Sequence, residues 1–382
     1  MNPVGPQQRL STRLAFLAAG LGMSAWAPLV PFAKSRLALS EGELGVLLLC
    51  LGAGSLMAMP VTGTLASRYG CRRVILWSGL LVCLMMPCLA VAGTPLLLGL
   101  SVFLFGAALG TMDVAMNIQA VIVERDSGGA MMSGFHGLFS VGGFVGAGAM
   151  ALLLWGGLSP LGASVAVALL LAAALLVAGP HLLRHPDAAE RDAPSFVMPH
   201  GAVILIGALC FIVFLAEGAM LDWSALLLTA GHDLDASRGG LGYAAFAIAM
   251  TFGRLTGDKV VSRFGGKRVM LAGGVCAAAG FFCSVLAPSA PVALLGFLLI
   301  GLGASNIVPI LFSAAGSQRA MPASLAISAV TTIGYAGILA GPALIGFIAH
   351  ASSLNLAFAC LGGAMLLVAA SARLGAASPA AK

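Results

Sequence analysis

The chain has 382 residues, of which 60% are hydrophobic and only 8% charged, and its formal net charge at pH 7 is +6. This composition excludes a soluble globular domain, which could not hide so much apolar surface behind a charged exterior. Several uncharged runs exceed the roughly 20 residues that cross a bilayer as a helix. The sequence therefore indicates a multi-pass membrane protein.

The first apolar run, LAFLAAGLGMSAWAPLVPF, could be a signal peptide with SAWAP as its cleavage site. The spans that follow it favour an uncleaved first transmembrane helix instead. Helical spans are predicted at about 12–33, 43–66, 74–93, 95–123, 130–154, 158–179, 201–229, 238–257, 269–287, 291–316, 322–350 and 353–373. The predicted fold is an all-α membrane protein with twelve transmembrane helices.

The basic residues predict how these spans are oriented. If the N-terminus is cytoplasmic, only Lys34, Arg36 and Arg238 of the 19 Lys and Arg residues fall outside. By the positive-inside rule, both termini are then expected in the cytoplasm, with a bacterial inner membrane as the expected location.

The two halves of the chain repeat each other. The polar stretch at 180–200 predicts a cytoplasmic linker between six-helix domains at 1–179 and 201–382. SRYGCRR (67–73) matches SRFGGKR (262–268) at an offset of 195 residues. The same offset pairs Gly106 with Gly301, Gly142 with Gly337 and Gly146 with Gly341. Two parallel, pseudo-symmetric six-helix bundles are typical of transporters.

GTLASRYGCRR (63–73) resembles the loop motif G-x-L-a-D-r-x-G-r-r of the major facilitator superfamily, and the chain resembles that family over essentially its whole length. Ser67 stands where the family usually has Asp. GILAGPALIG (337–346) resembles the family's Gly-Pro motif, and MDVAMNIQAVIVE followed by MSGFHGLFSVGGFVGAG resembles the MosC-type group, allied to the fucose permeases. The resemblance implies that the first loop, and its copy in the second half, help to lock the outward-facing state. The residues concerned are Gly63, Arg68, Gly70, Arg72, Arg73, Asp258, Arg263, Gly265 and Arg268.

Asp113 and Asn117 are predicted to line a cavity from span four. They are four residues apart and therefore share one helix face. A charge near the bilayer centre costs around 3 kcal/mol on insertion scales, so an acid inside a span is functional by default. The alternative is a close helix–helix contact in which Asp113 is a protonated hydrogen-bond donor.

His136 and Ser140 form a similar pair on span five. In an antiparallel hairpin, the residue numbers of two facing positions add up to a constant. Asp113 with Ser140 and Asn117 with His136 give the same sum. They are expected at matching depths, whereas the sequence leaves open whether they face each other. His136 could instead be a solvated residue near the cytoplasmic end.

Span seven carries two acids, Glu217 and Asp222, which lie about 140° apart on a regular helix. Both could face one cavity only if the helix is broken, which Gly218 makes possible. Alternatively, Asp222 and the neighbouring Trp223 form an interfacial anchor.

Asn306 and Trp26 complete the candidate substrate-binding residues. Asn306 lies one turn before Pro309, and its alternative role is that of a helix-kink partner. Trp26, beside Pro28, could stack against a ligand. The candidates for binding are thus Asn117, His136, Ser140, Asp222, Asn306 and Trp26.

No Lys or Arg is expected deep in a span, and Arg254 comes closest. Carriers of anions need such a cation. The buried acids are therefore expected to lack a protein partner, which favours neutral or cationic substrates. Asp113 and Glu217 are the predicted proton-coupling sites.

The predicted function is secondary active transport of a small polar solute by alternating access. The resemblance implies sugars, polyols or inositol-amine-like compounds, taken up by proton symport. The alternatives are proton-antiport efflux of a cationic or lipophilic compound, and a non-transporting sensor with a transporter fold. HExxH, GxSxG and GxxxxGK[ST] do not occur in the sequence, which argues against an enzyme.

The expected partners are a small-molecule substrate, protons and the lipid bilayer, without nucleic acid, and the protein is expected to act as a monomer. No cofactor or metal is predicted. The eight cysteines include no CxxC pair, and seven lie in apolar runs, so they are expected to pack as small hydrophobic residues.

Overall fold

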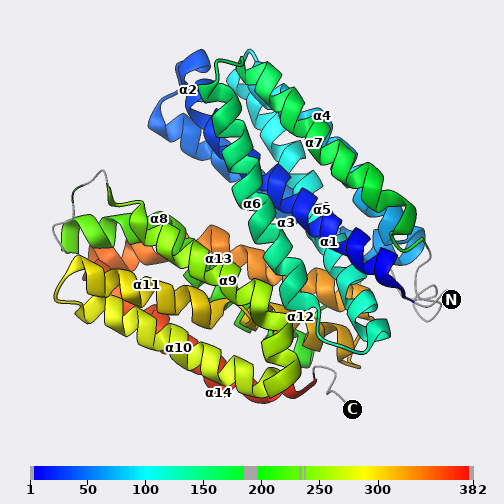
Figure 1. The fold of residues 1–382 in the computed structure, drawn as a ribbon. Coiled ribbons are helices and arrows are strands. Elements are labelled where there is room, and N and C mark those ends of the chain that lie inside the picture. Colours follow the sequence, from blue (N-terminus) through cyan, green and yellow to red (C-terminus); the bar gives the residue numbers. More distant parts are fainter. Residues whose placement is uncertain (1–3, 185–196, 232–234, 236–237, 378–382) are drawn as a thin grey trace. The chain divides into compact units, whose positions relative to one another are not determined.

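The computed structural model describes residues 4–184, 197–231, 235 and 238–377 (Figure 1). Ten helical segments of this part are long and apolar enough to cross a membrane. The other two predicted spans correspond to α9 (Leu241–Phe264), which is rich in charges near its end, and α14 (Leu354–Ala370), which has only 17 residues. The predicted twelve-helix fold is confirmed.

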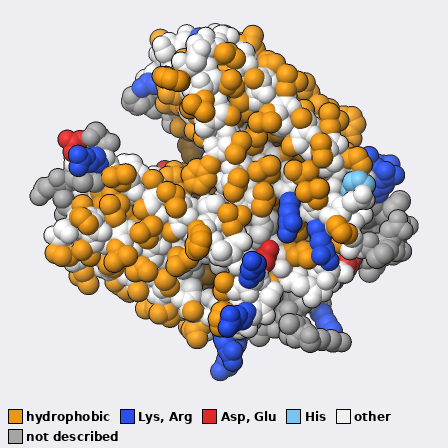
Figure 2. Space-filling view, viewed as in Figure 1, with side chains coloured by type: hydrophobic (Ala, Val, Ile, Leu, Met, Phe, Trp, Pro, Cys, Tyr) orange, Lys and Arg blue, Asp and Glu red, His pale blue; other side chains and the backbone are white. Residues whose placement is uncertain are grey.

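Hydrophobic side chains are spread over the whole visible face of the molecule, with few charged side chains among them (Figure 2). Large apolar residues such as Leu176, Trp155 and Leu286 are more than three-quarters exposed, at 77%, 86% and 78%. A soluble monomer rarely exposes so much contiguous apolar surface. The protein is a multi-pass integral membrane protein, and lipid covers this surface.

The described residues form two compact units. The first unit holds spans one to six without the first turns of α6, together with residues 322–328. The second unit holds spans seven to twelve without the first turns of α13, together with residues 128–137. The helices of the first half are α1 (Pro6–Ala25), α2 (Val30–Leu37), α3 (Glu41–Tyr69), α4 (Cys71–Val91), α5 (Pro95–Ser127), α6 (Met132–Trp155) and α7 (Pro160–Ala178). Those of the second half are α8 (Ala202–Gly231), α9, α10 (Gly266–Leu286), α11 (Ala290–Ala304), α12 (Ile307–Ser317), α13 (Ala323–Ala351) and α14.

The predicted linker at 180–200 has its centre, residues 185–196, outside the described residues. The domain boundaries at 1–179 and 201–382 therefore stay a prediction.

The two basic loops are tighter than the sequence suggested. A single residue, Gly70, separates α3 from α4, and Gly265 alone separates α9 from α10. Their φ angles are 80° and 79°, a backbone region that glycine enters without a Cβ penalty. The helices before these turns extend past the predicted ends at 66 and 257, because their last turns carry basic side chains that can reach water. The two turns occupy equivalent positions, 195 residues apart.

Glycines at repeat positions allow helices to approach closely within each unit. A Cβ on Gly106 of α5 would collide with the backbone oxygen of Leu51 on α3. A Cβ on Gly301 of α11 would collide in the same way with Phe246 on α9, and both partners obey the offset of 195. Membrane helices associate through such small residues because lipid supplies no hydrophobic driving force between them.

We expect Gly142→Ala to lower the thermal unfolding midpoint in detergent, whereas Gly341→Ala at the repeat position should not. A Cβ on Gly142 would collide with the Leu17 backbone oxygen, so a helix must shift, and overpacking of this kind costs about 1–3 kcal/mol. The atoms of Leu215 nearest to a Cβ on Gly341 lie 3.6 and 3.7 Å away, which is ordinary contact. Equal midpoints for the two variants would contradict this packing.

Within the described residues, two spans are interrupted, each beside a proline. A 3-10 turn, η1 (Ala27–Leu29), follows Trp26 and separates α1 from α2. Ser305 and Asn306 separate α11 from α12, in which Pro309 lies in the first turn. Discontinuous helices mark binding regions in many transporters, since they free backbone groups and side chains at mid-span.

Candidate functional site

Asp113 and Asn117 lie one turn apart on α5, as predicted. Asn117 is 1% exposed, and its Nδ2 donates to the backbone oxygen of Asp113 at 2.9 Å and to Oδ1 of that carboxyl at 3.4 Å. Over the described ranges, the buried Oδ1 of Asn117 makes no hydrogen bond, and no Lys or Arg pairs with the half-buried Asp113. The first unit thus presents an acid without a counter-cation beside a free amide acceptor.

Trp26 adds a free donor to the same unit. It lies at the break after α1 and is 5% exposed. Its indole Nε1 is buried and has no hydrogen-bond acceptor in the part of the chain that the structure describes. Buried polar groups normally find a partner, so water or a bound solute is the expected acceptor.

The structure assigns His136 and Ser140 to different units. His136 belongs with the second unit, where it is 9% exposed and its ring centroid lies 5.7 Å from that of Phe312 on α12. The alternative of a solvated histidine is therefore wrong. Ser140 lies half-buried in the first unit with Asp113 and Asn117. The equal sums of residue numbers predicted only that the two pairs lie at matching depths along α5 and α6. They could not predict that the boundary between the two units crosses α6, between His136 and Ser140.

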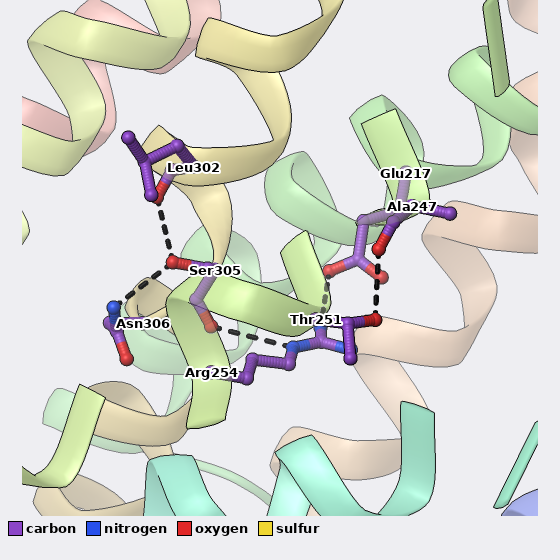
Figure 3. A network of polar contacts seen from close by, with 7 residues as sticks. All are labelled: Glu217, Ala247, Thr251, Arg254, Leu302, Ser305 and Asn306. Atoms are coloured by element: carbon purple, nitrogen blue, oxygen red, sulfur yellow. Dashed lines mark hydrogen bonds and ion pairs between the residues drawn. The ribbon is translucent and has the colours of Figure 1, made fainter. Parts of the chain in front are cut away.

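Glu217 of α8 forms an ion pair with Arg254 of α9 (Figure 3). Nη2 of Arg254 donates to Oε1 of Glu217 at 3.0 Å, and the two side chains are 8% and 19% exposed, respectively. Nε of Arg254 also donates to the backbone oxygen of Ser305 at 3.4 Å. The expectation that the buried acids lack a cationic partner is therefore wrong for Glu217. The cause is the length of α9, which places Arg254 well inside the helix instead of near its end.

Asn306 lies beside Ser305 at the break in span ten (Figure 3) and also bonds to α9. Its Nδ2 donates to the backbone oxygen of Gly253 at 3.2 Å and to Oγ of Ser305 at 3.0 Å. Oγ of Ser305 in turn donates to the Leu302 backbone oxygen at 2.7 Å. These bonds agree with a structural role at the break. A role in substrate binding stays a prediction that rests on Oδ1, which is buried without a hydrogen bond among the described residues.

α8 continues from Ala202 to Gly231, so the helix is not broken at Gly218. Glu217 faces Arg254, whereas Asp222 is exposed, and the two acids diverge as on a regular helix. Trp223 was not predicted as a site residue, because a Trp beside an Asp near a helix end is typical of an interfacial anchor. Its Nε1 is buried and unbonded within the described ranges, and its ring lies against Gly346 of α13.

Asp258, in the second basic motif, binds the start of α6. Its Oδ1 accepts a hydrogen bond from the backbone N–H of Gly134 at 2.9 Å. The first N–H groups of a helix lack intrahelical acceptors, and a carboxylate there also complements the helix dipole. The equivalent residue of the first motif is Gly63, which packs against Ser324 at the start of α13.

Ser67, which replaces the usual Asp of the first motif, makes a local hydrogen bond: its Oγ donates to the backbone oxygen of Thr64 at 2.9 Å. Near it, the backbone N–H of Arg72 donates to the Leu183 oxygen at 2.9 Å. In the second motif, the guanidinium of Arg263 lies 5.5 Å from the centre of the Phe264 ring. The roles of both motifs in locking a state stay predictions.

The sequence profile of the Major Facilitator Superfamily (MFS) matches residues 14–324. An uncharacterized MFS-type transporter of Yersinia pestis is 57% identical over 369 residues, covering 97% of this chain and 96% of that protein. The membrane protein MosC of Rhizobium meliloti is 35% identical over 343 residues, 89% of this chain and 83% of MosC. Among solved structures, the fucose:proton symporter FucP of E. coli has a TM-score of 0.78 at 17% identity, covering 98% of this chain and 99% of that chain.

These similarities agree with the twelve-helix fold described above. They confirm the resemblance to the MosC-type group, and they show that the chain shares its fold with FucP. The chain belongs to the Major Facilitator Superfamily, a family of membrane transporters and not of enzymes.

Proposed function

We propose that the protein is a proton-coupled symporter for a small polar solute, with Asp113 as the proton-coupling residue. The observation that carries the proposal is the state of Asp113: over the described ranges it lies inside a span without a cation, beside the unbonded Oδ1 of Asn117. An ionised carboxylate in this position is costly unless water or a ligand compensates it.

The proposed cycle uses that cost. When the cavity is open, water solvates Asp113 and the residue can release its proton; when the cavity closes, the protonated form is favoured. The unbonded Oδ1 of Asn117 then supplies a hydrogen-bond acceptor for a hydroxyl group of the solute. In the proposed cycle the solute binds only while Asp113 is protonated. This requirement couples the flux of the solute to the flux of protons.

Glu217 is the weaker candidate for proton coupling in this proposal. Its charge is balanced by Arg254 at 3.0 Å, so the pair can remain in the span as a net neutral unit. We assign the pair a structural role in the second unit.

A sugar, a polyol or an inositol-amine-like compound is the proposed solute class. Support comes from the similarity to MosC and from the fold that the chain shares with FucP, a fucose:proton symporter. An unbonded amide acceptor beside an acid without a cation suits a neutral polyhydroxylated compound.

Uptake into proteoliposomes tests the function. A panel of neutral polyols, sugars and organic cations is offered with the external pH acidic, alkaline or equal to the internal pH. We expect a polyhydroxylated solute to accumulate only when protons flow inward. Accumulation of a cation driven by outward proton flow, or the complete absence of flux for a folded protein, would favour the antiporter or the sensor instead.

The proposed topology has both termini in the cytoplasm of a bacterial inner membrane, in a monomeric protein. A single cysteine introduced between 180 and 200, in a variant that lacks the native cysteines, should resist an impermeant thiol reagent in intact cells. It should react after the cells are permeabilised. Labelling from outside would overturn this topology.

A further inference from the structure

The first unit has an open surface cavity of about 460 Å³ between α3, α4 and α5. This volume is in the range of ligand pockets. It is separate from Asp113 and Asn117, which do not line it. Its wall consists of Leu65, Val74, Ser78, Leu81, Ala107, Ala108 and Thr111, with Tyr69, Arg73 and Trp77 at one end.

Most side chains along the wall of the cavity are apolar. Oγ of Ser78 donates to the backbone oxygen of Val74 at 2.7 Å, so this hydroxyl is already bonded within α4. Ala107 and Ala108 leave room beside α5 where longer side chains would fill the space. Thr111 apart, a hydrocarbon chain can therefore lie along this wall without covering an unbonded polar group.

The end of the cavity near Gly70 is basic and aromatic. Arg73, Trp77 and Leu81 are spaced four residues apart on α4, so they form one line about 12 Å long from a cation to an aliphatic side chain. Tyr69 and Trp77 are 51% and 70% exposed. Exposed Tyr and Trp beside a basic residue are typical of the level of the lipid headgroups.

No carboxylate of the described chain pairs with Arg73, which is exposed. The surrounding motif, residues 63–73, contains three arginines and no acid, because Ser67 replaces the usual Asp. The positive charge at this end is therefore open to an external anion. A guanidinium suits a phosphate through paired N–H donors.

We propose that this cavity binds an anionic glycerophospholipid from the surrounding leaflet. The phosphate lies on Arg73, and an acyl chain lies along α4 toward Leu81. The cation explains a preference for an anionic headgroup, and the apolar wall explains why the ligand carries a chain. Basic pockets between membrane helices commonly hold anionic lipid headgroups. On the proposed topology, the lipid comes from the cytoplasmic leaflet, because the Arg73 end of the cavity lies on that side.

Native mass spectrometry of the full-length protein in detergent tests the site. Phosphatidylglycerol and phosphatidylethanolamine of identical acyl chains are added at equal concentration, and the fraction of protein that retains each lipid is measured. We expect the parent to retain phosphatidylglycerol several-fold better. Arg73→Gln should reduce its retention to the level of phosphatidylethanolamine, and Ala107→Leu, which fills the cavity, should reduce the retention of both lipids.

Arg268→Gln is the matched control, because Arg268 occupies the repeat position of Arg73 while Ala272 stands in the place of Trp77. It should leave retention unchanged. Glycerol 3-phosphate, which has a phosphate but no chain, should not displace the lipid. Equal retention of the two lipids by the parent, equal losses in Arg73→Gln and Arg268→Gln, or displacement by glycerol 3-phosphate would overturn the proposal. Thermal unfolding midpoints verify that each variant is folded, and Leu81→Trp replaces Ala107→Leu if that variant is not.

Discussion

Asp113→Asn is expected to abolish proton-driven accumulation of the solute while solute exchange across the membrane continues. Asparagine keeps the shape of the side chain and can still accept the hydrogen bond that Asn117 donates at 3.4 Å. It cannot release a proton, so it fixes the neutral form. With one proton per solute, a gradient of one pH unit supports at most about a tenfold accumulation, equivalent to about 1.4 kcal/mol. The variant should accumulate nothing above equilibrium.

The pH dependence of exchange provides a second measurement. In the parent, exchange should weaken as the pH rises, because the carrier loses the proton that solute binding requires. In Asp113→Asn it should be independent of pH. Asp126→Asn is the control on the same helix, since Asp126 is exposed and pairs with the adjacent Arg125 at 3.1 Å. That variant should accumulate solute like the parent. If Asp113→Asn does so as well, Asp113 is a structural hydrogen-bond donor between helices.

The parts of the fold that the sequence predicted are those that depend on local or repeated patterns. The offset of 195 residues predicted that Gly106 and Gly301 are equivalent, and in the structure each packs on a backbone oxygen whose residue obeys the same offset. The face shared by Asp113 and Asn117 follows from the helix period alone. Such features need no knowledge of which helices are neighbours.

The partner of Glu217 required information that the sequence did not contain. Arg254 is 37 positions away on another helix, and its depth depends on where α9 ends. The charged residues near Phe264 suggested an earlier end, although their side chains can reach water from an extended helix. Trp223 was missed for a related reason, because helix rotation decides whether an indole near a helix end faces lipid or packs inside.

The ion pair between Glu217 and Arg254 should be a strong determinant of stability. Removing one partner leaves the other charge buried without compensation, which in soluble proteins costs about 3–5 kcal/mol. We therefore expect Glu217→Gln and Arg254→Gln each to lower the thermal unfolding midpoint clearly. Arg254→Gln should lower it further, since it also removes the contact with the Ser305 backbone oxygen. Asp222→Asn, which changes an exposed acid on the same helix, should have little effect.

The double variant Glu217→Gln/Arg254→Gln decides between a structural pair and a second proton-coupling site. Because it removes both charges together, it should be more stable than either single variant, and the double-mutant cycle should show coupling of the two residues. It should also keep proton-driven accumulation, since the proposal assigns the proton to Asp113. Additive losses of stability would show that the pair contributes no net interaction. A stable double variant that exchanges solute but no longer accumulates it would transfer the coupling role from Asp113 to Glu217.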